Sequence, residues 1–153
     1  MNKGSDIKAL TILHKALLAG QVIFAAVCVF LAYAKMLPTA QEDLDRILQV
    51  MAVVLSAAGF IGGNSFFKKR VLEIRDMQTN AKEKLTMYRA ACIVQWALLE
   101  GPGIFTIICF FITGNYAFIA LASVLMLLFA MLAPSKTKIA FQLALSEEEL
   151  NEL

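Results

Sequence analysis

Histidine is nearly absent from this chain, and no motif of a known catalytic centre takes its place. The 153 residues include one histidine, His14, which excludes a haem held by two histidines within one subunit. The sequence has no Ser/His/Asp set, no ligand spacing typical of a metal site and no glycine-rich phosphate loop. We therefore predict a protein that is not an enzyme and that holds no metal ion and no cofactor.

Cysteine is also scarce. The three cysteines are Cys28, Cys92 and Cys109, and each lies within an apolar stretch. An odd number of cysteines in such stretches does not form a disulfide framework. Because a free cysteine behaves as a small hydrophobic residue, we expect Cys28 and Cys109 to be packing residues.

Charged side chains are few, and apolar ones are abundant. Hydrophobic residues make up 59% of the chain, whereas soluble domains average roughly 45–50%. The excess falls in four blocks, at residues 10–33, 47–67, 90–112 and 116–132. Each block is close to the ~20 residues with which a helix crosses the hydrocarbon core of a bilayer. The composition therefore predicts a membrane protein.

The predicted fold class is an all-α membrane protein with four transmembrane helices. We expect an up-down-up-down bundle built from two helical hairpins in tandem. The helices are expected at about residues 6–35, 40–77, 81–112 and 116–133, and a cytoplasmic tail follows over 134–153. One transmembrane domain then takes up the whole chain.

Capping patterns support these bounds. The pairs Thr39/Glu42 and Asn80/Glu83 match the capping box, in which two side chains three residues apart each bond the backbone of the other. Each pair precedes an apolar run, as expected at the start of a helix. Gly114 is expected to open a tight turn into the fourth helix.

The basic residues are distributed unevenly along the chain. Of 14 Lys and Arg, 12 fall in the N-terminal segment, the central connection and the C-terminal tail, and the other two are Lys35 and Arg46. Basic loop residues remain on the cytoplasmic side of a membrane. We therefore predict an inner-membrane protein with both termini in the cytoplasm. His14 is expected at the cytoplasmic interface of the first helix.

A basic cluster follows the second apolar block. Lys68, Lys69 and Arg70 lie where this helix leaves the membrane, and Arg75 follows on the same helix. Cations at such an exit normally meet lipid headgroups, so no nucleic-acid partner is expected. We predict that these four residues form a cytoplasmic basic surface for headgroups or for a partner protein.

Two stretches of the chain resemble one another. Residues 16–30 and 97–111 are identical at eight of fifteen aligned positions, and shared glycine, phenylalanine and cysteine indicate a duplicated unit. The copies differ where Ala19 is replaced by Glu100 and where Gln21 is replaced by Pro102. The first and third helices would then run in the same direction, which is a parallel repeat.

Glu100 is the clearest candidate for a functional site. A carboxylate in hydrocarbon is costly, and such acids face the bundle interior or a water-filled cavity. Burial favours their neutral form. Pro102 cannot donate to the carbonyl of Leu98, and Gly101 and Gly103 remove side-chain bulk beside it. The freed carbonyl and Glu100 together could hold a proton or a cation.

Helical spacing and the repeat indicate which residues join Glu100. Gln21 on the first helix has nearly the same depth and is the expected partner, and Ser56 on the second helix is the next candidate. A neutral Glu100 bonded to Gln21 would fix the packing of the bundle. An ion- or proton-linked role for the same pair is the alternative.

Small residues recur in the second helix. Gly59 and Gly63 form a GxxxG pattern, which lets membrane helices approach closely. Packing within the bundle is the favoured interpretation, and homodimerisation is the alternative.

The tail supports two interpretations. Apolar residues alternate at Ile139, Phe141, Leu143 and Leu145. This alternation predicts an extended segment, and Ser146 with Glu149 predicts a short capped turn after it. The tail is either solvated or docked against the cytoplasmic hairpin or a partner.

These observations favour a non-catalytic function. We predict an accessory or interaction subunit of a larger membrane assembly, with the lipid bilayer and a membrane protein as partners. The alternative is a small proton- or cation-linked transporter that acts as an oligomer through Glu100.

Overall fold

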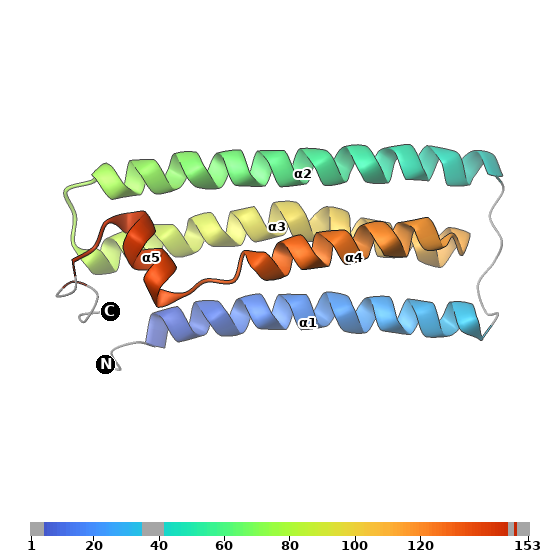
Figure 1. The fold of residues 1–153 in the computed structure, drawn as a ribbon, viewed down its shortest axis with the longest axis horizontal. Coiled ribbons are helices and arrows are strands. Elements are labelled where there is room, and N and C mark those ends of the chain that lie inside the picture. Colours follow the sequence, from blue (N-terminus) through green and yellow to red (C-terminus); the bar gives the residue numbers. More distant parts are fainter. Residues whose placement is uncertain (1–4, 35–41, 147–148, 150–153) are drawn as a thin grey trace.

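Helices account for all of the regular structure in the part of the chain that the computed structural model describes, which is residues 5–34, 42–146 and 149. The helices are α1 (Ser5–Tyr33), α2 (Glu42–Asp76), α3 (Ala81–Thr113), α4 (Tyr116–Met131) and α5 (Lys136–Leu143). The first four lie side by side along the longest axis of the molecule, and α5 lies near the end at which α2 connects to α3 (Figure 1). The predicted all-α class is confirmed.

Three of these helices are long and apolar enough to cross a membrane, over Ile7–Tyr33, Asp43–Asp76 and Ala81–Thr113. The 16 residues of α4 extend about 24 Å, which is less than the ~30 Å of a hydrocarbon core. A fourth span arises only if α4 is taken together with α5, which bends away from it by 72°. The structure therefore supports three membrane spans, or four if α4 and α5 together form one.

α3 is the central helix of the bundle. It contacts α1, α2 and α4, whereas α1 makes its main contacts with α3 and α4. In its most apolar window α3 is 44% buried, compared with 17% for α1 and for α2. The two flanking helices therefore direct most of their apolar side chains outward, away from the protein interior.

Side-chain caps set the ends of α3 and α4. The Asn80 side chain accepts a hydrogen bond from the Glu83 N–H at 2.9 Å, which confirms the predicted cap. The reciprocal bond from the Asn80 N–H to the Glu83 carboxylate does not occur in the described part of the chain. Gly114 has a φ of 70°, which suits glycine, and Asn115 then caps α4. The predicted Thr39/Glu42 box lies outside the described residues.

The segment 136–143 is the helix α5, so the predicted extended conformation is wrong. Ile139 and Leu143 are fully buried and lie four residues apart, on one face of α5, whereas Phe141 is 85% exposed. The Tyr88 hydroxyl on α3 donates to the Gln142 side chain at 2.7 Å. The part of the tail that forms α5 is thus docked against the bundle.

The predicted turn at Ser146 and Glu149 is confirmed. The Ser146 N–H donates to the Glu149 carboxylate at 2.8 Å, and the Glu149 N–H donates to the Ser146 hydroxyl at 3.2 Å. The backbone N–H of Ser146 is the main reason that the pKa of Glu149 lies below its usual value.

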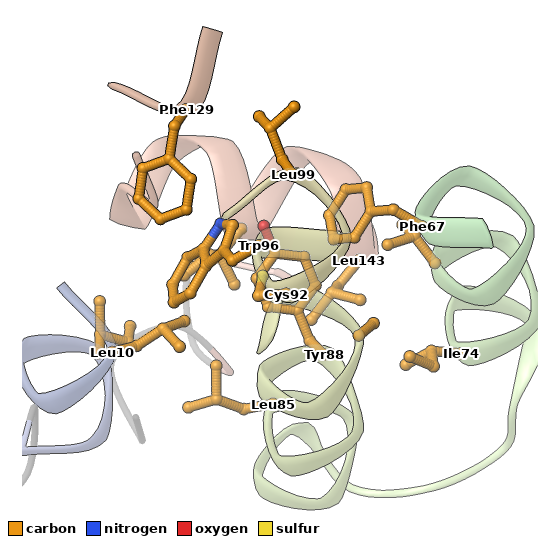
Figure 2. Close-up of a cluster of buried hydrophobic side chains, with 14 of the residues drawn as sticks. Leu10, Phe67, Ile74, Leu85, Tyr88, Cys92, Trp96, Leu99, Phe129 and Leu143 are labelled. Atoms are coloured by element: carbon orange, nitrogen blue, oxygen red, sulfur yellow. The ribbon is translucent and has the colours of Figure 1, made fainter. Parts of the chain in front are cut away.

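Two hydrophobic clusters make up the core. The larger cluster lies at the end of the bundle that carries α5. In it, Tyr88, Cys92 and Trp96 occupy successive turns of α3 (Figure 2). Leu10 from α1 and Phe67 from α2 approach them from either side (Figure 2). The smaller cluster lies nearer the other end. It contains Cys28, Cys109, Phe110 and Phe118. All three cysteines are free and buried.

Candidate functional site

Glu100 lies on α3, half-buried, and the Gln21 side chain of α1 faces it. Gln21 is only 3% exposed. Its amide oxygen would lie 3.1 Å from a Cβ atom at Gly103, so this glycine makes room for the amide. The Gln21 Nε2 atom forms no hydrogen bond with any described residue. The structure therefore brings the predicted pair together but leaves one buried donor unused beside the acid.

The carbonyl that Pro102 leaves free does not belong to the Glu100 site. Gly59 of α2 covers the Leu98 oxygen so closely that a Cβ atom at this position would overlap it, and the same atom would come within 2.9 Å of Pro102 Cγ. Glu100 instead faces Gln21 on α1. The expected single site is thus divided between two sides of α3.

The other predicted members of the site take separate positions. Ser56 is buried, and its hydroxyl donates to the Ala52 carbonyl of its own helix at 2.6 Å. Gly63 faces α3, where an added Cβ atom would lie 3.4 Å from the Gln95 carbonyl oxygen. Both glycines of the GxxxG pattern therefore contact α3. A Cβ atom at Gly101 would meet nothing within 4 Å, so this glycine removes no steric conflict.

Two interior polar contacts had no clear sign in the sequence. The Gln95 amide on α3 donates to the Asn64 side chain on α2 at 2.8 Å. Near the start of α2, the side chains of Gln49 and Asn115 both donate to the same oxygen of Asp45 at 2.7 Å. These bonds tie α2 to α3 and to the start of α4.

His14 lies inside the bundle and does not face outward, while its depth at the cytoplasmic interface stays a prediction. It is 2% exposed, and its Nε2 atom lies 2.9 Å from the Phe129 carbonyl oxygen. Its ring stacks on Phe129 with centroids 4.7 Å apart and meets the edge of Trp96 at 4.9 Å. This cluster joins α1, α3 and α4.

The buried face of α1 explains this placement, although the sequence does not reveal that face because the exposed residues of α1 are also apolar. The buried residues of α1 are spaced by three, four or seven positions, which places them on one helical face. They are Ile7, Leu10, His14, Gln21, Ala25 and Cys28. Both polar members of this set therefore point inward.

The predicted basic surface is divided into two parts. Lys68 and Arg75 line a cleft of about 420 Å³ between α2, α3 and α5, and Lys138 of α5 lines it as well. Arg70 pairs with Glu73 at 2.8 Å, and with Lys69 it lies at a different depression of the surface. We call the first feature the α2–α3–α5 cleft.

Comparison with known proteins provides no related protein from which a function for this site could be inferred. No group of three potential metal ligands occurs among the described residues. Neither the protein-family models, nor the curated proteins, nor the solved structures match the chain. Its function therefore has to follow from its own side chains.

Proposed function

We propose that this chain is a multi-pass protein of the cytoplasmic membrane that has no catalysis of its own. In this proposal it is an accessory or interaction subunit of a larger membrane assembly. Its four helices cross the bilayer up-down-up-down as two tandem hairpins, and both termini lie in the cytoplasm. The 12-to-2 distribution of basic residues supports this orientation.

The apolar outer faces of α1 and α2 carry the proposal. On α1, Ile23 and Phe30 are exposed, and on α2, Val54 and Ile61 are exposed along a helix of 35 residues. Soluble monomers rarely expose continuous apolar patches of more than a few hundred Å². Contact with lipid and with another membrane protein would cover these faces.

The use of the interior polar groups favours an accessory subunit over a transporter. The buried hydroxyls of Ser56, Thr106 and Thr113 each donate to a carbonyl of their own helix. Gln95 pairs with Asn64. Polar groups that already form hydrogen bonds within the protein are poor binding sites along an ion pathway.

Glu100 supports the second candidate function, a proton- or cation-linked transporter. The acid is half-buried, and the unused Gln21 donor lies beside it. Intramembrane acids are common in proton relays. Since Gly59 and Gly63 already contact α3, the oligomer that such a transporter needs would have to use another surface.

Affinity purification from membranes in a mild detergent, followed by mass spectrometry, tests the proposal. A larger membrane protein recovered in stoichiometric amount is the expected result. Photo-crosslinkers at Ile23 and Ile61, which are both 63% exposed, provide a matched pair on α1 and α2. A partner that covers one face should crosslink from one of them only. Recovery of a homodimer alone would contradict the proposal in favour of the transporter.

A further inference from the structure

The α2–α3–α5 cleft combines cationic and apolar walls. Lys68, Arg75 and Lys138 line it, and no acidic residue does so in the part of the chain that the structure describes. Lys68 and Arg75 form no ion pair with any described residue. Their charges are therefore available to an anion.

Lys138 has a fixed position at the edge of the cleft. Its ammonium group donates to the carbonyls of Met131 and Ala133, at 3.2 and 3.4 Å, where α4 ends. These bonds hold the cation in place before any ligand arrives. An ammonium group has three donor hydrogens, so one donor remains for a ligand.

The apolar wall of the cleft is partly exposed. Phe141 is 85% exposed and lines the cleft together with Leu72, which is also exposed, and with Phe67. Burial of such surface contributes roughly 25 cal/mol for each Å² removed from water. A ligand with an apolar part would gain this contribution, and a free phosphate ion would not.

The cleft lies at the depth expected for lipid headgroups. Lys68 directly follows the apolar block 47–67, and cations at this point of a helix meet anionic headgroups. The axis of α5 turns by 72° from that of α4. If α4 stands across the membrane, α5 runs close to the membrane plane, where short amphipathic helices contact the boundary of headgroups and acyl chains.

We propose that the α2–α3–α5 cleft binds one anionic phospholipid. Lys68, Arg75 and Lys138 hold its phosphate, Leu72 and Phe141 contact its glycerol backbone and upper acyl carbons, and its acyl chains leave past Phe67 toward the bilayer. This inference rests on the proposed membrane location but needs neither a partner protein nor a particular orientation. A lipid at this place would brace α5 against α2 and α3.

Native mass spectrometry of the delipidated full-length chain in detergent tests the inference. The probes are phosphatidylglycerol and phosphatidylcholine with identical acyl chains. We expect one retained phosphatidylglycerol and a clear preference for it over phosphatidylcholine. In the variant Lys68→Gln/Arg75→Gln, binding should weaken about fivefold for each lost cation, roughly 25-fold in all.

Lys69→Gln/Arg70→Gln is the matched control, because it removes the same charge from the same helix outside the cleft. It should bind phosphatidylglycerol as the unmodified chain does. Phe141→Ser should weaken the binding of the lipid without affecting the fold, since the ring is exposed. Circular dichroism of each variant confirms that the helices are intact.

Three results would overturn the inference. Equal weakening in both double variants would show that general surface charge attracts the lipid. Equal retention of both phospholipids would show that no anion site exists. Displacement by inorganic phosphate at concentrations similar to those of the lipid would show that the apolar wall is not used. None of these results bears on the presence of a partner protein, so the proposed function is tested separately.

Discussion

Gly59 lets two helices meet at a carbonyl that a proline leaves free. Because Pro102 has no N–H, the Leu98 oxygen lacks its donor in the helical ladder. Gly59 covers this oxygen from α2, and a Cα–H group can serve as a weak donor to such a carbonyl. The hydrogen bond missing from α3 at Pro102 and the close approach of α2 are therefore parts of one contact.

The substitution Gly59→Ala should separate α2 from α3, since its Cβ atom would overlap the backbone oxygen of Leu98. Overpacking of this kind costs about 1–3 kcal/mol. Gly62→Ala is the matched control, because its Cβ atom would meet nothing within 4 Å. Removing this glycine from a helix interior should stabilise the fold by up to about 1 kcal/mol. Thermal unfolding in detergent measures both effects, and equal melting temperatures would contradict the role of Gly59.

Glu100 distinguishes the two candidate functions at the residue scale. If the acid only contributes to packing, Glu100→Gln keeps a donor and an acceptor beside Gln21 and should preserve both stability and activity. Glu100→Leu removes the polar side chain that the buried Gln21 amide faces, and since no full hydrogen bond is lost it should cost at most about 1 kcal/mol, the scale of membrane hydrogen bonds. Detergent melting and complementation of a deletion strain report the two properties. If Glu100→Gln folds but does not complement the deletion strain, Glu100 does more than contribute to packing. This result would contradict the proposed accessory function.

Some residue contacts could be predicted and others could not. The predicted repeat puts Gln21 at the depth of Glu100, because it aligns the two stretches residue by residue, and the two side chains do face one another. Asn64 and Gln95 gave no such signal, since their pairing depends on how α2 is rotated against α3. The same rotation directs the Leu98 carbonyl toward Gly59 and away from Glu100, which a single helix cannot reveal.

At the scale of elements, α5 depends on its docking. An isolated helix of eight residues is too short to be stable in water. Its two fully buried residues, Ile139 and Leu143, insert into the larger cluster, and Gln142 accepts a hydrogen bond from Tyr88. The docked face therefore supplies the stability that the segment lacks.

Leu143→Ala should release α5 while the rest of the bundle remains folded. Truncation of a buried leucine costs about 2–5 kcal/mol, which is more than a short helix can lose. Phe141→Ala, on the exposed face of the same helix, should change stability by less than about 0.5 kcal/mol. Hydrogen exchange over residues 136–143 measures the release. Equal protection in the two variants would contradict the account of α5.

The ends of α3 could be predicted from the sequence more accurately than the conformation of the tail. Asn80 and Gly114 carry side-chain and backbone signals that act within one turn, so they fix the two ends of α3 locally. In the tail, the alternation of apolar residues matches the pattern of a strand. Ile139 and Leu143 are also four residues apart, which is the spacing of one face of a helix. Ser135 caps α5 by accepting a hydrogen bond from the Lys138 N–H, and this start signal favours a helix.

At the scale of the whole molecule, α3 is the most buried of the long helices, and it packs against α1 and α2, which have apolar outer faces. α3 carries Glu100, Pro102 and the Gln95 contact, while α1 and α2 supply the surfaces on either side. A membrane location would account for these outer faces and for the uneven distribution of basic residues. The proposed subunit function and the lipid site both depend on it.

Cysteine labelling in intact cells tests this central claim most directly. In a background with the three native cysteines replaced by alanine, Ala117→Cys probes the start of α4 and Gln78→Cys probes the connection between α2 and α3. Both positions are exposed, and neither side chain forms a hydrogen bond in the structure. A membrane-impermeant reagent should modify Ala117→Cys in intact cells and Gln78→Cys only after lysis. Labelling of Gln78→Cys without lysis would contradict the proposed orientation, and labelling of neither position before lysis would contradict passage across the membrane.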